Sequence, residues 1–255
     1  MAKRVQDASI VVARTEDRAY GPWVCPACSG QVALKKGPLV THHFAHYPPF
    51  SCEYGRGETE EHRQCKTAIF DAISSEPNTS KWELERNLGS VRPDVSGYIG
   101  QTPVAIEVQA SSLGLERISK RTSEYAVKNI SVIWLGLWHD RLLDDRFTPS
   151  VWEKWLHALY FGRVYYWKEG GNVVPVHFGK HMLYVAPSDW HDEFGQEQSG
   201  GDYYRRSKRF REAKIADPVA ITSMTTRIRN SWSGGGYNIP ASRLWIDCLP
   251  AWWSK

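Results

Sequence analysis

The chain has 255 residues, a formal net charge of +4 and 24% charged residues. This length allows one large domain or two modest ones with a hydrophobic core. No segment approaches the roughly 20 consecutive apolar residues of a membrane span, and the charged start from Met1 to Asp17 has no apolar signal region. We expect a globular protein whose mild positive charge permits nucleic-acid binding but does not require it.

The cysteine content indicates a reducing compartment. The sequence has five cysteines, and an odd number without a secretion signal argues against a disulfide framework. We therefore expect a cytoplasmic protein in which closely spaced cysteines bind a metal ion.

A zinc-type pattern lies near the N-terminus, between a strand-like segment at Ser9–Ala13 and Pro49. Its expected ligands are Cys25, Cys28, His43 and His46, with a short hairpin over Val32–Val40 between them. Two thiolates and two imidazoles suit tetrahedral Zn²⁺, and four protein ligands make the ion structural. A redox Cys-x-x-Cys pair with unrelated histidines is the alternative. The fourth ligand stays open, because His42 and Cys52 are nearby and His-x2-His is shorter than the usual spacing.

The next stretch predicts a helix, three strands, a helix and a strand. The first helix starts near Glu58 and has Cys65, Ile69, Phe70 and Ile73 at helical spacing. The remaining elements are strands at Trp82–Arg86, Val91–Ile99 and Pro103–Gln109, a helix at Leu113–Asn129 and a buried strand at Ser131–Leu137. This order predicts a mixed α and β domain in which two of the strands form a hairpin.

Two acidic residues lie at corresponding places in that hairpin. Asp94 is near the start of one strand and Glu107 near the end of the next, with twelve residues between them. Adjacent antiparallel strands bring such positions close together, and Gln109 shares a face with Glu107. Two carboxylates and an amide suit Mg²⁺ or Mn²⁺, which can assist phosphodiester hydrolysis. From the spacing alone, a strand pair with exposed acids is as good an interpretation.

Further motifs make the chain resemble the competence protein CoiA-like family of the PD-(D/E)xK nuclease superfamily. In order they are Cys25-Pro-Ala-Cys28, His43-Phe-Ala-His46, Glu61-His62 with Lys66, Arg92-Pro-Asp94, Glu107-Val-Gln109-Ala-Ser111, and Arg121 with Tyr125. The resemblance implies a restriction-endonuclease-like core, a central mixed sheet flanked by helices, with Asp94 and Glu107 as metal ligands. Gln109 occupies the usual place of a lysine, so the group that positions the attacking water stays open.

The resemblance also implies that Glu61, His62 and Lys66 belong to the catalytic site. His62 and Lys66 share a helical face, and Lys66 could contact the scissile phosphate; a solvent-exposed helix surface is the alternative. Arg121 and Tyr125 are one helical turn apart and are candidates for contacting the DNA backbone. For Arg121, a structural ion pair with a carboxylate is at least as good an interpretation.

The C-terminal half predicts aromatic helices and a basic segment. Pro149–Trp167 has helical spacing of aromatic residues, and Tyr203–Ile215 reads as a basic helix. Its basic side chains alternate with aromatic ones, as in segments that bind phosphates and stack on bases; a solvated helix is the alternative. The residues expected to contact nucleic acid are Arg205, Arg206, Lys208 and Arg209. We expect most of the twelve tryptophans to pack in the core.

These observations predict four segments: a strand and zinc module at 1–55, the nuclease core at 56–140, a helical aromatic-rich extension at 141–195 and a basic segment at 196–255. The function expected is cleavage of DNA during transformation or recombination, with DNA and recombination proteins as partners. One alternative is a zinc-stabilised DNA-binding or scaffold protein with an inactive core. Another is a defence or restriction nuclease that cuts foreign DNA.

Overall fold

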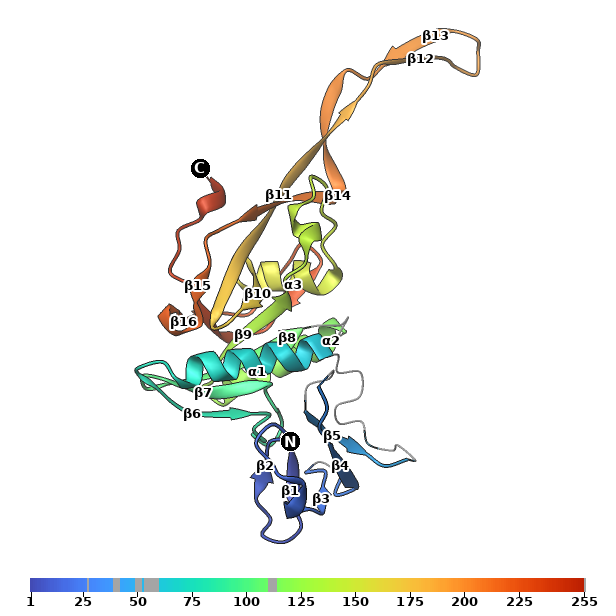
Figure 1. Ribbon diagram of the computed structural model, residues 1–255. Coiled ribbons are helices and arrows are strands. Elements are labelled where there is room, and N and C mark those ends of the chain that lie inside the picture. The colour runs from blue at the N-terminus through green and yellow to red at the C-terminus, as the bar shows by residue number, and fades with distance from the viewer. Residues whose placement is uncertain (27, 39–41, 49–51, 53–59, 110–113, 255) are drawn as a thin grey trace.

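The computed structural model describes residues 1–26, 28–38, 42–48, 52, 60–109 and 114–254. A small N-terminal sheet lies at one end of the molecule, a larger mixed sheet with helices forms the body, and a long two-stranded ribbon projects from the other end (Figure 1). Within these ranges no helix is long and apolar enough to cross a membrane.

The N-terminal sheet is antiparallel and has the strand order β2-β1-β3-β4-β5. Its strands are β1 (Ala2–Arg4), β2 (Ile10–Val11), β3 (Trp23–Val24), β4 (Gln31–Lys35) and β5 (His43–His46). The buried residues of this sheet form a separate, small cluster of Ala2, Ala13, Trp23, Cys25, Val32 and Leu34. So few apolar residues make a weak core, which is the usual situation of a module that a metal ion stabilises.

The large sheet runs in the order β14-β11-β10-β9-β8-β7-β6, and β15, β16 and β19 join it off this path. The strands are β6 (Thr79–Leu84), β7 (Val95–Ile99), β8 (Thr102–Gln109), β9 (Ser131–Leu137), β10 (Val164–Glu169), β11 (Asn172–Val185), β14 (Tyr203–Ile215), β15 (Val219–Ala220), β16 (Thr225–Arg229) and β19 (Ser242–Ile246). The three central strands β8, β9 and β10 are parallel, and antiparallel pairs flank them. The predicted mixed sheet is therefore confirmed.

In the described part of the chain, three α-helices pack on this sheet: α1 (Glu60–Ser74), α2 (Leu115–Val127) and α3 (Val151–Leu159). α1 runs across β6, β7 and β8 (Figure 1) and buries Cys65, Ile69 and Ile73, as its spacing predicted. α2 packs against β9 and β19, and α3 packs against β10 and β18 (Tyr237–Ile239). The helix-strand-strand-strand-helix-strand order expected from the sequence is present from residue 60 to 137.

The expected helical extension is wrong beyond Leu159. α3 begins with a capping box between Ser150 and Glu153 and ends at Leu159. Phe161 and Gly162 then have φ of 55° and 93°, and this left-handed backbone ends the helix. The aromatic run Tyr165–Trp167 follows in β10, because β-branched and aromatic residues suit a half-buried strand.

The expected basic helix at Tyr203–Ile215 is also wrong, because this segment is strand β14. It pairs antiparallel with β11 along most of its length, so hydrogen bonding to an available strand outweighs the helix propensity of arginine and lysine. The two strands extend away from the body as a ribbon and lead to a hairpin of β12 (Ser188–His191) and β13 (Glu197–Gly200) (Figure 1). A further hairpin pairs β17 (Trp232–Gly234) with β18.

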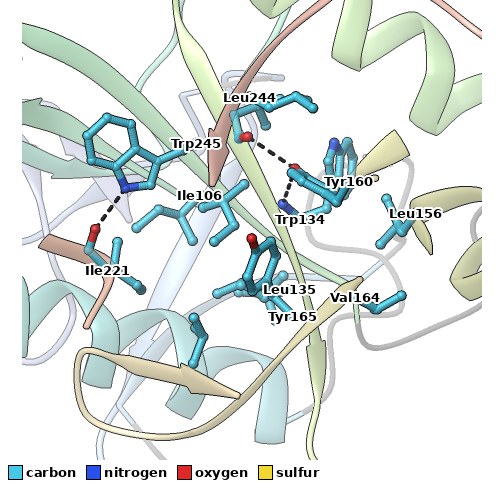
Figure 2. Close-up of a cluster of buried hydrophobic side chains, with 14 of the residues drawn as sticks. Ile106, Trp134, Leu135, Leu156, Tyr160, Val164, Tyr165, Ile221, Leu244 and Trp245 are labelled. Carbon is cyan, nitrogen blue, oxygen red and sulfur yellow. Dashed lines mark hydrogen bonds between the residues drawn. The ribbon is translucent and has the colours of Figure 1, made fainter. Parts of the chain in front are cut away.

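Aromatic residues fill the core of the body. Trp134, Trp155 and Trp245 are buried, and the indole of Trp245 donates a hydrogen bond to Ile221 O (2.8 Å; Figure 2). The hydroxyl of Tyr160 donates to Val132 O (3.0 Å). It also accepts from Trp134 N at 3.0 Å (Figure 2). The expected packing of tryptophans in the core is confirmed for Trp134, Trp155 and Trp245, whose side chains lie inside the molecule.

Candidate functional site

The acids of the hairpin lie across from each other. Val95 in β7 pairs with Ile106 in β8, so the next pair outward along this register is Asp94 and Glu107. The backbone N–H of Val108 donates to Asp94 Oδ2 (2.8 Å), which joins the two chain segments at this point. The juxtaposition of these two carboxylates that the sequence predicted is present in the structure.

Asp94 is held in its charged form. His62 Nε2 on α1 lies 3.2 Å from Asp94 Oδ2, and the side chain of Asp94 is 18% exposed. Burial alone would raise the pKa of Asp94, but hydrogen bonds from His62 and Val108 and the nearby charge of Lys66 lower it below its usual value. His62 is therefore a positioning residue for this carboxylate.

Glu107 is more deeply buried than Asp94, and its pKa is shifted in the opposite direction. It is 1% exposed, and both Arg121 and the hydroxyl of Tyr125 donate to its Oε1. Burial and the nearby charge of Asp94 raise the pKa of Glu107 to about 8, against the lowering effect of Arg121. The ion pair between Arg121 and a carboxylate is thus present, and the guanidinium of Arg121 also donates to Arg92 O (2.7 Å).

Lys66 takes part in a buried ion pair. It is 6% exposed and its ammonium binds Glu85 Oε1, so a solvent-exposed position for this lysine is wrong. Glu85 follows β6 with φ of 52°, and its backbone carbonyl accepts from Arg92 Nε (2.7 Å). The sequence analysis missed Glu85, because only the fold brings it to Lys66, nineteen positions away in the chain.

The carboxylates retain oxygens for a divalent ion. The hydrogen bonds of the described residues engage Asp94 Oδ2 and Glu107 Oε1. Within that part of the chain neither Asp94 Oδ1 nor Glu107 Oε2 receives a hydrogen bond. Asp94 offers an anionic oxygen and Glu107 an oxygen that becomes anionic above its raised pKa of about 8, and both fit the oxygen preference of Mg²⁺ or Mn²⁺.

Gln109 lies beyond Glu107 on the same face of β8 and in the wall of a cavity of about 550 Å³. It is 2% exposed, and neither Oε1 nor Nε2 of its amide has a hydrogen-bond partner among the described residues. Glu61 lines the same cavity from the exposed start of α1. Gln109 therefore lies two positions from Glu107 on the same strand face and forms part of the cavity wall.

A second site gathers thiols and an imidazole in the N-terminal module. The cluster consists of Cys25, Cys28, His46 and Cys52, whose ligand atoms all lie within 4.8 Å of one another. Cys28 Sγ is 3.3 Å from His46 Nε2, and Cys25 Sγ is 4.0 Å from Cys52 Sγ. A hydrogen bond from Gly30 N lowers the pKa of Cys28 to about 7, which favours a thiolate. This donor set fits a structural Zn²⁺.

Cys52 replaces His43 in this cluster, which corrects the ligand set expected from the sequence. His43 and His46 belong to one strand, where they pair with Lys35 and Val32. Residues three apart in a strand point to opposite faces, so one ion on the sheet surface cannot bind both. The rival ligand Cys52 supplies the fourth position.

The basic residues expected to contact nucleic acid lie on the projecting ribbon. Arg205, Arg206, Lys208 and Arg209 are all exposed on β14. The register with β11 shifts between Lys180 and Met182, and Ser207 Oγ accepts from Phe210 N (2.8 Å) in the irregular stretch. The ribbon is therefore an exposed cationic surface outside the carboxylate site.

Comparisons with known proteins agree with the motif order. The nuclease-like domain of competence protein CoiA matches residues 58–146, and the N-terminal domain of the same family matches residues 10–55. Competence protein CoiA of Bacillus subtilis (strain 168) is 27% identical over 112 residues, which are 44% of this chain and 30% of that protein. No solved structure gives a significant match. Through these two domains, the chain belongs to the competence protein CoiA-like family.

Proposed function

We propose that this protein is a Mg²⁺- or Mn²⁺-dependent nuclease that hydrolyses phosphodiester bonds in DNA at Asp94 and Glu107. The observation that carries the proposal is the apposition of the two carboxylates across β7 and β8, each held through one oxygen. The nuclease-like family domain supports it. A restriction-endonuclease-like core of the PD-(D/E)xK type accounts for the same arrangement.

When bound, the divalent ion would neutralise charge on the scissile phosphate and activate water. Asp94 and Glu107 would hold the ion. His62 orients Asp94, and Arg121 with Tyr125 fixes Glu107. Lys66 and Glu85 form a buried ion pair beside Asp94, and the charge of Lys66 helps to keep that carboxylate ionised. Lys66 could contact the phosphate only if its ion pair with Glu85 were broken. Gln109 is the candidate for orienting the attacking water.

The biological role we propose follows from the family. The similar Bacillus subtilis protein carries the name competence protein CoiA. We therefore propose that this protein processes DNA during transformation or recombination. The basic ribbon supports DNA as the partner, because exposed arginine and lysine neutralise phosphates. Zinc in the N-terminal module is proposed as structural.

A second candidate is a DNA-binding protein with an inactive core. The environment of Glu107 favours it, because a carboxylate already paired with Arg121 and raised in pKa is a weaker ligand for a divalent ion. In that case zinc binding and DNA binding would persist without hydrolysis.

Cleavage of DNA by purified, zinc-loaded protein separates the two candidates. We expect cutting of single- or double-stranded DNA with Mg²⁺ or Mn²⁺, and a loss of about 100-fold or more in Asp94→Asn and Glu107→Gln, which keep the side-chain shape. Asp71→Asn is the matched control, because Asp71 lies on α1 but pairs with Arg14 away from the site. Equal cutting by all four proteins would refute the nuclease assignment.

A further inference from the structure

The cavity beside Gln109 has an aromatic wall. Four of its lining residues are Trp138, Trp152, Tyr166 and Trp167, and we call the space the aromatic pocket. Its volume of about 550 Å³ is within the range of sites that bind small organic groups. Trp138, Trp152 and Trp167 are half-buried, so their rings are partly accessible from the space that they surround.

A glycine lets two rings of the pocket wall pack against the sheet next to Gln109. Gly136 in β9 is the register partner of Gln109 in β8. A Cβ at Gly136 would lie 2.8 Å from the ring of Tyr166 and 3.1 Å from Trp152. These two rings therefore pack directly on bare backbone beside the amide.

The amide of Gln109 needs a polar partner. A carboxamide that is 2% exposed and has no partner among the described residues leaves a donor and an acceptor unsatisfied, which is unfavourable unless a ligand binds them. A ligand for this pocket must therefore be flat, for the rings, and must carry a donor and an acceptor on one edge. Nucleobases have both properties.

The charges at the rim fit a base that is attached to a phosphodiester backbone. The ammonium of Lys168 lies 5.4 Å from the centre of the Trp138 ring and is exposed. It can pair with a phosphate while the neutral base occupies the apolar interior. Glu61 also lines the pocket, and its carboxylate disfavours a second phosphate there, so one base is the better match.

We propose that the aromatic pocket binds one unpaired base of a single-stranded nucleic acid next to the carboxylate site. This inference rests on the proposed function, because it names the strand that the site would receive. A paired base cannot enter, since its edge and faces are already covered in the duplex. Single-stranded DNA is thus the preferred substrate.

The test measures binding of fluorescent oligonucleotides by anisotropy, with zinc-loaded protein and no added Mg²⁺ or Mn²⁺. The probes are one single-stranded DNA, the same strand with abasic sites throughout, and its duplex. Stacking on an aromatic side chain contributes about 1–3 kcal/mol per base, so the normal strand should bind roughly 5- to 140-fold tighter than the abasic strand. The duplex should bind no tighter than the abasic strand.

Variants locate the effect. Trp152→Ala and Gln109→Leu should lower the affinity for the normal strand to the affinity for the abasic strand. Trp152→Phe should keep most of the difference between the two affinities. Trp232→Ala is the matched control, because Trp232 is 44% exposed on β17, outside the pocket. Equal affinity of wild type for normal and abasic strands would overturn the proposal, and so would an unchanged preference in Trp152→Ala. Base-dependent binding without cleavage would instead refute only the nuclease function.

Discussion

Two facing carboxylates, Asp94 and Glu107, differ in how readily they ionise. The pKa of Asp94 is lowered by His62 and Val108 in spite of burial, whereas burial raises the pKa of Glu107 to about 8. A carboxyl is protonated below its pKa and then competes poorly for a cation. Glu107 therefore limits metal binding at neutral pH, and Asp94 does not.

This difference predicts the pH dependence of the nuclease. As pH rises through about 8, Glu107 loses its proton, so the Mn²⁺ concentration for half-maximal cleavage should fall by about tenfold per pH unit below that value. Cleavage rates measured from pH 6 to 9 at a series of Mn²⁺ concentrations test this. A requirement for Mn²⁺ that does not change with pH would contradict it.

Zinc ligation gives a second prediction for single residues. Cys52→Ser removes a member of the thiol and imidazole cluster, whereas His43→Ala removes a residue outside it. We expect about one zinc per chain in wild type and His43→Ala, and a large loss in Cys52→Ser. Metal analysis after gel filtration measures this. Zinc lost from His43→Ala but retained in Cys52→Ser would restore the ligand set expected from the sequence.

At the scale of elements, the ribbon carries positive and negative side chains in different parts. We call the paired strands β11 and β14 the shaft. The shaft carries the exposed cations Arg205, Arg206, Lys208 and Arg209. The hairpin beyond it and its approach carry the exposed acids Asp189, Glu193, Glu197 and Asp202. A polyanion would therefore contact the shaft and avoid the hairpin.

Replacing the four shaft cations by alanine should weaken DNA binding in a salt-dependent manner. Each phosphate contact contributes about 0.7 to the slope of log affinity against log salt for single strands, so the slope should decrease by up to about 3. Binding measured between 50 and 200 mM salt, roughly the range over which such contacts are lost, gives the slope. Glu197→Ala in the hairpin is the control. An unchanged slope in the fourfold variant would show that the shaft does not contact DNA.

For the whole molecule, the sequence predicted the body well from residue 60 to 137. Its elements are local, so the helical spacing of Cys65, Ile69 and Ile73 and the compact turn between β7 and β8 decided them. The apposition of Asp94 and Glu107 followed from that hairpin. Motif order also identified the family.

The C-terminal half could not be predicted in the same way, because its structure depends on distant pairing. β14 is a strand only because β11 is present to pair with it. The same limit applies to the sites. Glu85 reaches Lys66 through the packing of α1 on β6. The aromatic pocket combines residues of α1, β8, β10 and α3, and no local pattern connects them. That His43 and His46 do not bind the same zinc ion could have been predicted from the sequence. A strand over His43–His46 places the two imidazoles on opposite faces.

Binding of Mn²⁺ by zinc-saturated protein, followed by electron paramagnetic resonance, tests most directly that Asp94 and Glu107 form a catalytic metal site. Zinc saturation keeps Mn²⁺ out of the thiol and imidazole cluster. Above about pH 8, where Glu107 is ionised, we predict one strongly bound Mn²⁺ per chain in wild type and in Asp71→Asn, and its loss in the Asp94→Asn/Glu107→Gln double variant. Undiminished Mn²⁺ binding in the double variant, with its fold intact, would contradict the account.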